Sequence, residues 1–396
     1  MTVMLKKFFW PVLVALIATI ALGGCEDAIV PTTTTTSTST SSSSSMTSTS
    51  FSTTTSTIIT PAGLTFVSQN VAYTGTYTGN IYASLALNSH NQPRMSYYSR
   101  FFQTLQYTYG TINSWTTEVV DGISDTGQYS SMAIDSSGKA RISYYIPRVS
   151  GLGYAAQTGI ASWTATIIDQ PTGIDVGYFS SLAIDTNGYL HIAYYDWTNK
   201  QLKYTTNKSG SWVATVIDGP NKGKYCSIAM DSNNYAHIAY YDEPNGYLLY
   251  ATNKLGSWSK ENIDVHSPVG QTTSIVVDTS NMVHISYYDS LLGDLKYAYG
   301  SLGMWTVRQV DLTGDVGAQS SIDLDSNGEP HISYYDATNG YLKYAYRTDG
   351  MTWTTAVVDN SGNVGQDTSL KIDSNNKAHI AYYNGTSYLL KYSVQQ

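Results

Sequence analysis

The sequence predicts an all-β fold, a seven-bladed β-propeller of four-stranded antiparallel blades. A motif of the form Ser-x-x-Ile-Asp-x-x-x-x-x-His-Ile-Ser/Ala-Tyr-Tyr-Asp recurs in steps of 46 to 50 residues. Such a period, made of short alternating segments, is typical of a propeller blade. Aromatic residues make up 13% of the chain, mostly as 35 tyrosines, which favours strands. The first tyrosine of each motif is Tyr97, Tyr144, Tyr194, Tyr240, Tyr287, Tyr334 or Tyr382.

Each repeat divides into four strands, as the third repeat illustrates. Residues 180–185 predict the innermost strand, 191–195 the second, 201–205 the third and 212–217 the outermost. Period-2 alternation and β-branched or tyrosine-rich content favour strands at these places. Segments of the Asp-Thr-Asn-Gly type supply the tight turns, because Gly and Asn accept positive φ.

The two ends of the repeat region predict how the ring closes. The seventh repeat stops near Ser393 without an outer strand, whereas residues 66–71 resemble an outer strand that lacks a blade, with Phe66 at the tryptophan position. We therefore expect the N-terminal strand to complete the last blade, which removes two open sheet edges. Deletion of residues 64–71 should prevent a stable ring.

Residues 1–25 predict a lipoprotein signal peptide. Two lysines precede a short apolar run that ends in Leu-Gly-Gly-Cys25, the order of an export signal. The ending resembles the lipobox of bacterial lipoproteins, which implies cleavage before Cys25 and diacylglycerol on its sulfur. The resemblance implies an exported chain, lipid-anchored to the cell envelope and facing outside the cytoplasm. An ordinary cleaved signal and an uncleaved anchor are the alternatives.

Residues 26–62 predict a disordered stalk, and residues 63–396 the propeller. From Pro31 to about residue 60 nearly every residue is Thr or Ser. Such a segment has nothing to bury and cannot offset its chain entropy. The stalk would lift the domain off a membrane, and an unspecific spacer is the alternative.

The repeat resembles the tyrosine-rich units of bacterial surface propellers that are grouped with sialidase-like and fucose-lectin-like folds. The resemblance covers residues 64–396. Those groups include hydrolases, lectins and proteins of unknown role, so the resemblance implies the fold and leaves the activity open. The sialidase Asp-box, Ser-x-Asp-x-Gly-x-Thr-Trp, is matched only in part by the residues before Trp212 and Trp353.

The charge balance argues against a nucleic-acid partner. The formal net charge is −8, and no Lys/Arg cluster offsets it. A negative surface of this kind repels phosphate backbones, and phosphorylated lipids are disfavoured for the same reason.

Most residues that recur in the repeats are predicted to be framework. The tryptophans that open the outer strands should pack against the third strand or the next blade. Histidines begin the second strands, with Arg94 and Arg141 in their place in the first two repeats, and should hydrogen-bond between blades rather than hold a metal. The turn acids lack the other ligands of a calcium loop, so no cofactor is predicted and calcium is an alternative without a complete motif. Cys226 should be a small buried filler.

The candidate ligand-binding residues lie on the face that carries the inter-blade loops. Acids after the tyrosine pair, and a second set that ends the outer strands, either accept hydrogen bonds from sugar hydroxyls or cap their own loops. Trp197 is an unrepeated loop aromatic that could stack on a sugar ring, and residues after the inter-blade glycines should surround the channel mouth, the preferred site. The candidates are Gln128, Tyr178, Gln271, Gln366, Asp196, Trp197, Asp242, Asp289 and Asp336.

The leading hypothesis is a surface-displayed, non-catalytic, monomeric binding propeller for a glycan or an envelope protein. A sialidase-like hydrolase would need three arginines on the substrate carboxylate, and the six arginines of this chain supply no converging triad. A divergent glycoside hydrolase or lyase stays an alternative, because sequence gives no separation between carboxylates. A protein–protein scaffold in an envelope complex is the other alternative.

Overall fold

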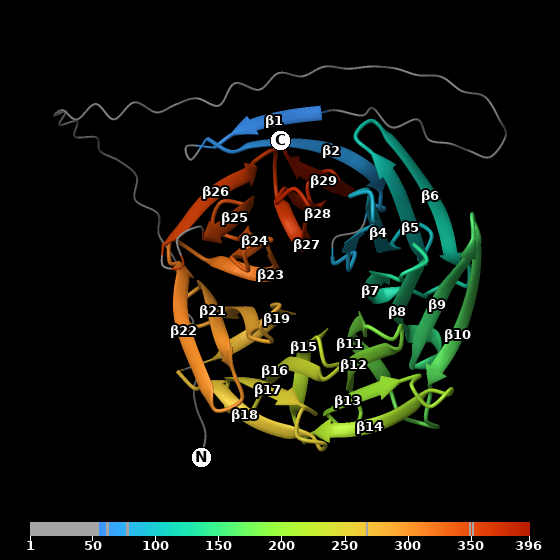
Figure 1. Cartoon of the computed structure of the whole chain (residues 1–396). Coiled ribbons are helices and arrows are strands. Elements are labelled where there is room, and N and C mark those ends of the chain that lie inside the picture. The colour runs from blue at the N-terminus through green and yellow to red at the C-terminus, as the bar shows by residue number, and fades with distance from the viewer. Residues whose placement is uncertain (1–54, 61–62, 77–78, 267, 348–349, 351) are drawn as a thin grey trace, which may run out of the picture. The chain divides into compact units, whose positions relative to one another are not determined.

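The computed structural model describes residues 55–60, 63–76, 79–266, 268–347, 350 and 352–396. These residues form seven antiparallel sheets arranged as blades around a central channel (Figure 1). Six sheets have four strands and the seventh has five. The predicted seven-bladed β-propeller is therefore confirmed. No described helix has the length and apolar character that would let it cross a membrane.

The first six blades run in chain order from the innermost strand outward. Blade 1 contains β3 (Ser84–Leu87), β4 (Pro93–Ser99), β5 (Thr104–Thr111) and β6 (Ser114–Asp121). Blade 2 contains β7 (Gln128–Ile134), β8 (Ala140–Ile146), the 3-10 turn η1 (Pro147–Val149), β9 (Gly151–Gly159) and β10 (Ser162–Asp169). Blade 3 contains β11 (Val176–Ile184), β12 (Leu190–Asp196), β13 (Gln201–Thr206) and β14 (Val213–Asp218). Blade 4 contains β15 (Lys222–Met230), β16 (Ala236–Asp242), β17 (Tyr247–Thr252) and β18 (Ser259–Asp264). Blade 5 contains β19 (Val269–Val277), β20 (Val283–Asp289), β21 (Asp294–Ser301) and β22 (Met304–Asp311). Blade 6 contains β23 (Val316–Leu324), β24 (Pro330–Asp336), β25 (Tyr341–Arg347) and β26 (Trp353–Asp359).

Blade 7 joins the two ends of the domain. Its inner strands are β27 (Val364–Ile372), β28 (Ala378–Asn384) and β29 (Leu389–Gln395), and β2 (Thr65–Tyr73) pairs antiparallel with β29. The predicted closure by the N-terminal strand is confirmed, and it gives the outer edge of β29 a paired strand.

A fifth strand, β1 (Thr55–Ile59), pairs with β2 on the outside of blade 7. These residues were predicted to belong to the disordered stalk, and for them that prediction is wrong. Their backbone finds partners along β2, and Ile58 lies opposite Phe66, so Thr-rich composition does not prevent pairing here. The predicted signal peptide, Cys25 and residues 26–54 of the stalk lie outside the described residues.

Aromatic contacts hold neighbouring blades together at seven equivalent places. Each outer-strand aromatic packs edge-on or tilted against the third-strand tyrosine of the preceding blade, with ring centroids 4.9 to 5.5 Å apart. Phe66 does so on Tyr344, and Trp115 does so on Tyr392 of the last blade. Such pairs add about 0.5 to 1.5 kcal/mol each beyond area burial. The framework role predicted for the tryptophans and for Phe66 is confirmed.

The acids that end the outer strands also connect blades. In six blades the first tyrosine of the repeated pair donates its hydroxyl to the acid of the preceding blade, at 2.5 to 2.9 Å. Four of these acids also pair with a lysine of the next blade whose side chain is at most 12% exposed. The acids are Asp121, Asp169, Asp218, Asp264, Asp311 and Asp359. In four blades the same acid also caps its own loop through Oδ1, as the structural alternative predicted, whereas the bonds between blades were not predicted.

The repeated histidines are framework too, but their hydrogen bonds lie within a blade and not between blades as predicted. His191 Nδ1 lies 2.5 Å from the Tyr204 hydroxyl on the adjacent strand, and its Nε2 faces Asp185 at 3.4 Å. The reason is register, because residues 191 and 206 are directly paired and the Tyr204 side chain shares a face with His191. Burial lowers the pKa of His191, which keeps the imidazole neutral near pH 7.

Candidate functional site

Seven residues, one from each blade, surround the mouth of the channel in a left-handed backbone conformation. Their φ angles lie between 49° and 55°, an uncommon range for residues other than glycine. In β11 the pairing passes from Tyr178–Tyr195 to Ser181–Ala193, so the strand bulges at Phe179. The bulge turns one side chain per blade into the channel. The seven residues, here called the mouth ring, are Tyr82, Tyr129, Phe179, Tyr225, Thr272, Gln319 and Asp367.

Blades 1 to 4 supply an aromatic half of the mouth ring. Tyr82 and Tyr129 have ring centroids 4.4 Å apart. Tyr129 and Phe179 follow at 4.9 Å, and Phe179 and Tyr225 at 4.7 Å. Four consecutive blades therefore present one continuous aromatic arc to the channel.

Blades 5 to 7 supply a polar half in which each side chain accepts from the backbone of the next blade. Gln319 N donates to Thr272 Oγ1 at 3.1 Å, and Asp367 N donates to Gln319 Oε1 at 2.8 Å. Asp367 Oδ2 then accepts from Ile81 N and Tyr82 N, at 2.5 and 3.0 Å. The hydrogen-bonded arc thus ends where the aromatic arc begins.

Asp367 is the acidic member of the mouth ring. Burial raises the pKa of its carboxyl to about 6, although the two backbone donors and the nearby Arg100 oppose the rise. The Arg100 guanidinium is held beside the mouth by a 3.0 Å hydrogen bond from Nε to the Asn80 carbonyl. The Asp367 carboxyl is therefore mostly ionised at pH 7 and becomes protonated in mild acid.

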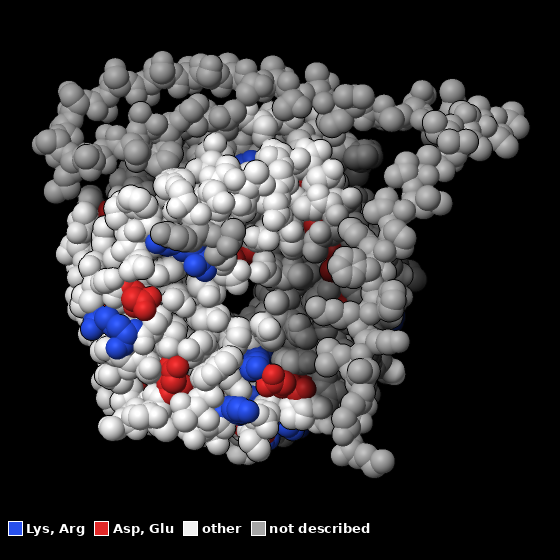
Figure 2. Space-filling view, turned by 180° about the vertical axis from the view of Figure 1, so that it is seen from behind, with Lys and Arg blue, Asp and Glu red and all other residues white. Residues whose placement is uncertain are grey.

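The mouth ring opens into a cavity of about 450 Å³. Its lining consists of the ring itself and six further residues, Asn80, Gln271, Tyr288, Ala318, Tyr335 and Gln366. A second cavity of about 250 Å³ continues deeper between the innermost strands, where serines and threonines follow the ring residues. Figure 2 shows an opening near the middle of one face, bordered mostly by uncharged residues.

In blades 2 and 3 the residue that lines the cavity is the one that follows the predicted mouth residue. Gln271 and Gln366 line the cavity, in agreement with their predicted place at the channel mouth. Gln128 does not line it and donates from Nε2 to Asp125 Oδ1 at 3.4 Å. Tyr178 also lies outside the lining, and the following residue, Phe179, takes the place in the ring. One sequence signal could have identified the ring. The residue at this position of the repeat varies, being aromatic in four blades and polar in three, whereas the framework positions around it stay nearly constant.

Tyr178 instead extends the aromatic surface outward to Trp197. Tyr129 and Tyr178 have centroids 5.5 Å apart, and Tyr178 stacks on Trp197 at 5.0 Å and 30°. Trp197 is 46% exposed, and Lys224 Nζ lies 5.1 Å from its ring. The structure thus joins two predicted candidates, Tyr178 and Trp197, into one aromatic track that leaves the channel along blade 3.

Asp175 fixes the orientation of this track. Its Oδ1 accepts from the Tyr145 hydroxyl at 2.8 Å, and its Oδ2 accepts from the Tyr178 hydroxyl at 3.0 Å. The Asp175 carbonyl accepts from Trp197 N at 2.8 Å. Asp175 therefore holds the Tyr178 hydroxyl and the backbone of Trp197.

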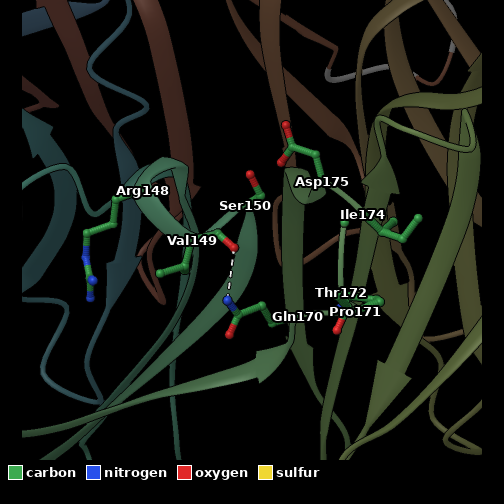
Figure 3. A pocket seen from close by; sticks show the side chains of 9 residues that line it. Arg148, Val149, Ser150, Gln170, Pro171, Thr172, Ile174 and Asp175 are labelled. Atoms are coloured by element: carbon green, nitrogen blue, oxygen red, sulfur yellow. Dashed lines mark hydrogen bonds between the residues drawn. The ribbon is translucent and has the colours of Figure 1, made fainter.

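A wider hollow of about 700 Å³ lies beside Asp175, between blades 2 and 3. Figure 3 shows Arg148 and Asp175 on opposite sides of it, with the Arg148 side chain directed downward and the Asp175 carboxylate directed upward in this view. Gln170 Nε2 donates to the Val149 carbonyl at 3.1 Å and ties the inter-blade loop to η1. The hollow borders the aromatic track and widens the surface beside it.

The acids that follow the tyrosine pair are not part of the mouth cavity. Asp196, Asp242, Asp289 and Asp336 are buried, with 1 to 3% of their surface exposed. Asp196 accepts from Asn199 N and Asn199 Nδ2, at 2.8 and 2.9 Å, and Asp336 makes the same pair of bonds with Asn339. Their oxygens thus cap their own turns, which favours the structural alternative for this set.

Among the described residues no group of three or more His, Cys, Asp or Glu side chains is placed to hold a metal ion. Cys226 is buried beside the channel, and its thiol lies 3.2 Å from the Phe179 carbonyl. Burial raises the pKa of this thiol, as expected for a filler.

These features define a seven-bladed β-propeller with one asymmetric site at its channel mouth. No known protein family matches the sequence, and no curated protein matches it. A protein of unknown function from Dyadobacter fermentans has a TM-score of 0.51 at 13% identity, covering 83% of this chain and 97% of that one. The Aleuria aurantia lectin, solved with Fucα1-6GlcNAc, has a TM-score of 0.51 at 13% identity, covering 73% and 98%. A Hadza microbial sialidase has a TM-score of 0.47 at 14% identity, covering 77% and 73%. The structural neighbours thus include a lectin, a sialidase and a polysaccharide lyase, and the two likenesses with a TM-score above 0.5 show the fold alone.

Proposed function

We propose that this protein binds a neutral oligosaccharide at the channel mouth and does not turn it over. The observation that carries the proposal is the division of the mouth ring into an aromatic arc and a polar arc around one cavity of about 450 Å³. A pyranose ring has apolar C–H faces and a rim of hydroxyls. An aromatic wall with a few converging polar groups is the lining that orients such a ligand.

The size of the bound saccharide follows from the aromatic track. A terminal sugar fits the cavity, where it would contact Tyr129 and the amide of Gln319. The next sugar units would lie along Tyr178 and reach Trp197. Because the ring is aromatic in four consecutive blades and polar in the other three, we expect one site per propeller rather than seven equivalent ones.

The arginines support binding over sialidase chemistry. Arg141 and Arg347 are engaged in ion pairs with Asp135 and Glu329. Arg100 is the arginine held beside the mouth. The Aleuria aurantia neighbour, solved with a fucosylated disaccharide, is an example of this fold holding a neutral sugar.

We further propose that the domain is exported and displayed at the cell envelope by a lipid on Cys25, with the Thr/Ser-rich segment as a stalk. The order of leader, cysteine and low-complexity segment in the sequence supports this part. Metabolic labelling with a palmitate analogue tests it, because label should enter the wild-type chain and be lost in Cys25→Ala.

Calorimetric titration of the full chain with sugars chosen from a glycan array tests the binding site. In Tyr129→Ala we expect affinity to fall about tenfold, the loss of one aromatic contact of about 1.5 kcal/mol. Leu291→Ala, an exposed loop residue away from the ring, is the matched control and should bind as the wild type does. Unchanged affinity in Tyr129→Ala, or no saturable binding of any neutral sugar, would contradict the proposal.

The enzyme alternative has a separate outcome. If reducing ends accumulate when the chain is incubated with a bound oligosaccharide, and stop accumulating in Asp367→Asn, the protein is a hydrolase or lyase. The claim of binding without turnover would then be wrong.

A further inference from the structure

A second pocket lies between blades 1 and 2, at the strand ends far from the mouth. It has a volume of about 340 Å³ and is lined by strand residues of both blades and by the turns at Gly138 and Gly159. Arg94 stands at the first end of β4, whereas the mouth is reached from the other end of that strand. The pocket is therefore separate from the proposed saccharide site, and the inference below does not rest on that proposal.

The neighbouring blade shows how an arginine at this position is normally satisfied. In blade 2, Asp135 Oδ1 caps the turn by accepting from Ser137 N and Lys139 N, both at 2.9 Å. Its other oxygen, Oδ2, accepts from Arg141 Nε and Nη2 at 3.0 and 2.5 Å. One carboxylate thus supplies both the turn cap and the counter-ion.

In blade 1 an asparagine replaces this aspartate. Asn88 Oδ1 still caps the turn, accepting from His90 N and Gln92 N at 3.0 and 2.9 Å. Its second atom is the donor Nδ2, which is bonded to Gln92 Oε1 at 3.0 Å. A donor cannot accept from a guanidinium, so the counter-ion of blade 2 has no equivalent in blade 1.

Arg94 consequently makes only weak contacts with the described residues. Its Nη atoms donate to the Pro93 carbonyl at 3.2 Å and to Gln92 Oε1 at 3.3 Å, and its guanidinium lies 5.3 Å from the Tyr109 ring centroid. No ion pair joins Arg94 to another described residue. Three of its five N–H groups therefore have no acceptor among these contacts.

The rest of the lining fits an anion on Arg94. Lys139 adds a second positive charge. Gln157 accepts from Ala140 N through Oε1 at 3.2 Å, and its Nε2 has no acceptor among the described residues. Glu118 also lines the pocket, but its two oxygens accept from Ala161 N and Trp163 Nε1 of blade 2. Glu118 thus contributes one negative charge to the lining, which the two positive charges of Arg94 and Lys139 outnumber.

We propose that this pocket binds the carboxylate of an acidic sugar, with Arg94 as the bidentate donor. An arginine fork matches a carboxylate in geometry and charge, and the Tyr109 ring gives a sugar an apolar surface to lie on. The carboxylate of the bound sugar would give Arg94 the acceptor oxygens that Asp135 gives Arg141 in blade 2.

Titration of the full chain with glucuronate at low ionic strength tests this assignment, with glucose and sulfate as comparison ligands. We expect saturable binding of glucuronate and none of glucose at this pocket. Binding should weaken by about tenfold to a hundredfold in Arg94→Gln, the range for a charge-assisted hydrogen bond. Asn88→Asp should weaken it similarly, because it returns the internal counter-ion, and should also raise the unfolding midpoint.

Asn88→Asp keeps the test decisive even if Arg94→Gln fails to fold. Wild-type affinity for glucuronate in Asn88→Asp would overturn the proposal, as would the absence of saturable glucuronate binding to the wild type. Equal affinity for sulfate would overturn the assignment of a carboxylate. Tyr129→Ala, which removes a contact of the saccharide site, should leave glucuronate binding unchanged.

Discussion

The buried pair of Asp359 and Lys391 offers the sharpest test of the view that the outer-strand acids are framework. Lys391 Nζ on β29 lies 2.5 Å from Asp359 Oδ2 at the end of β26, across the boundary between blades 6 and 7. The same oxygen accepts from the Tyr382 hydroxyl at 2.5 Å, and Ser361 N donates to Oδ1 at 2.9 Å. Burial alone raises the pKa of Asp359, but the lysine and these donors outweigh it and hold the pKa below its usual value.

Asp359→Ala should therefore be strongly destabilising. The side chains of the two partners are 1% and 6% exposed, so the mutation leaves an uncompensated ammonium inside the domain. The expected cost is about 3 to 5 kcal/mol. Adding Lys391→Met removes the stranded charge and should restore about 1 to 3 kcal/mol, a coupling typical of residues in contact.

Urea unfolding of the full chain, followed by tryptophan fluorescence, measures both effects. The matched control is Lys260, which pairs with the equivalent acid Asp218 at 2.9 Å but is 41% exposed. Lys260→Met should cost less than about 1 kcal/mol, because water screens that pair. A cost below about 1 kcal/mol for Asp359→Ala, or strict additivity with Lys391→Met, would refute the reasoning.

Three further predictions concern ring closure and pH. Phe66→Ala should cost about 3 to 5 kcal/mol, because the ring is fully buried against Tyr344, whereas the exposed Phe101→Ala should cost little in the same urea experiment. Asp367 has a folded pKa of about 6 against an ordinary value of 3.8, so the folded state keeps a proton that the unfolded state has lost. Stability therefore falls by up to about 3 kcal/mol as pH rises from about 4 to 6, and Asp367→Asn should remove this slope. The repeated histidines act oppositely: burial lowers their pKa, the unfolded state takes up protons first below about pH 6.5, and stability falls on acidification. Unfolding midpoints between pH 7 and 5 should consequently drop more steeply in Asp367→Asn than in the wild type; equal slopes would contradict the assignment. These histidines are His191, His237, His284, His331 and His379.

The blades and their closure could be predicted from the sequence because they depend on patterns that repeat. The period fixes the number of blades, and strand alternation fixes which side chains point inward. Phe66 could be assigned to the tryptophan position because six other repeats define what that position looks like. The packing of the outer-strand tryptophans could be predicted in the same way, because it recurs at the blade boundaries.

The mouth ring could not be placed in the same way. In blades 2 to 7 its position depends on a bulge in the innermost strand, and the hydrophobic period does not determine where a bulge falls. A slip of one residue exchanges Tyr178 for Phe179 in the cavity lining. Likewise, β1 depends on a neighbouring strand edge and not on its own Thr-rich composition.

Both proposed sites arise where one blade departs from its siblings while keeping their backbone. At the mouth, the left-handed residue is retained in all blades, but its side chain changes from aromatic to polar between Tyr225 and Thr272. Between blades 1 and 2, the turn cap is retained, but Asn88 has an amide nitrogen where its counterpart Asp135 has the oxygen that accepts from an arginine. A repeat architecture makes such departures inexpensive, because the framework contacts of the other blades hold the ring while one side chain is free to vary. Function in this propeller should therefore be sought at positions where the backbone geometry repeats and the side chain does not.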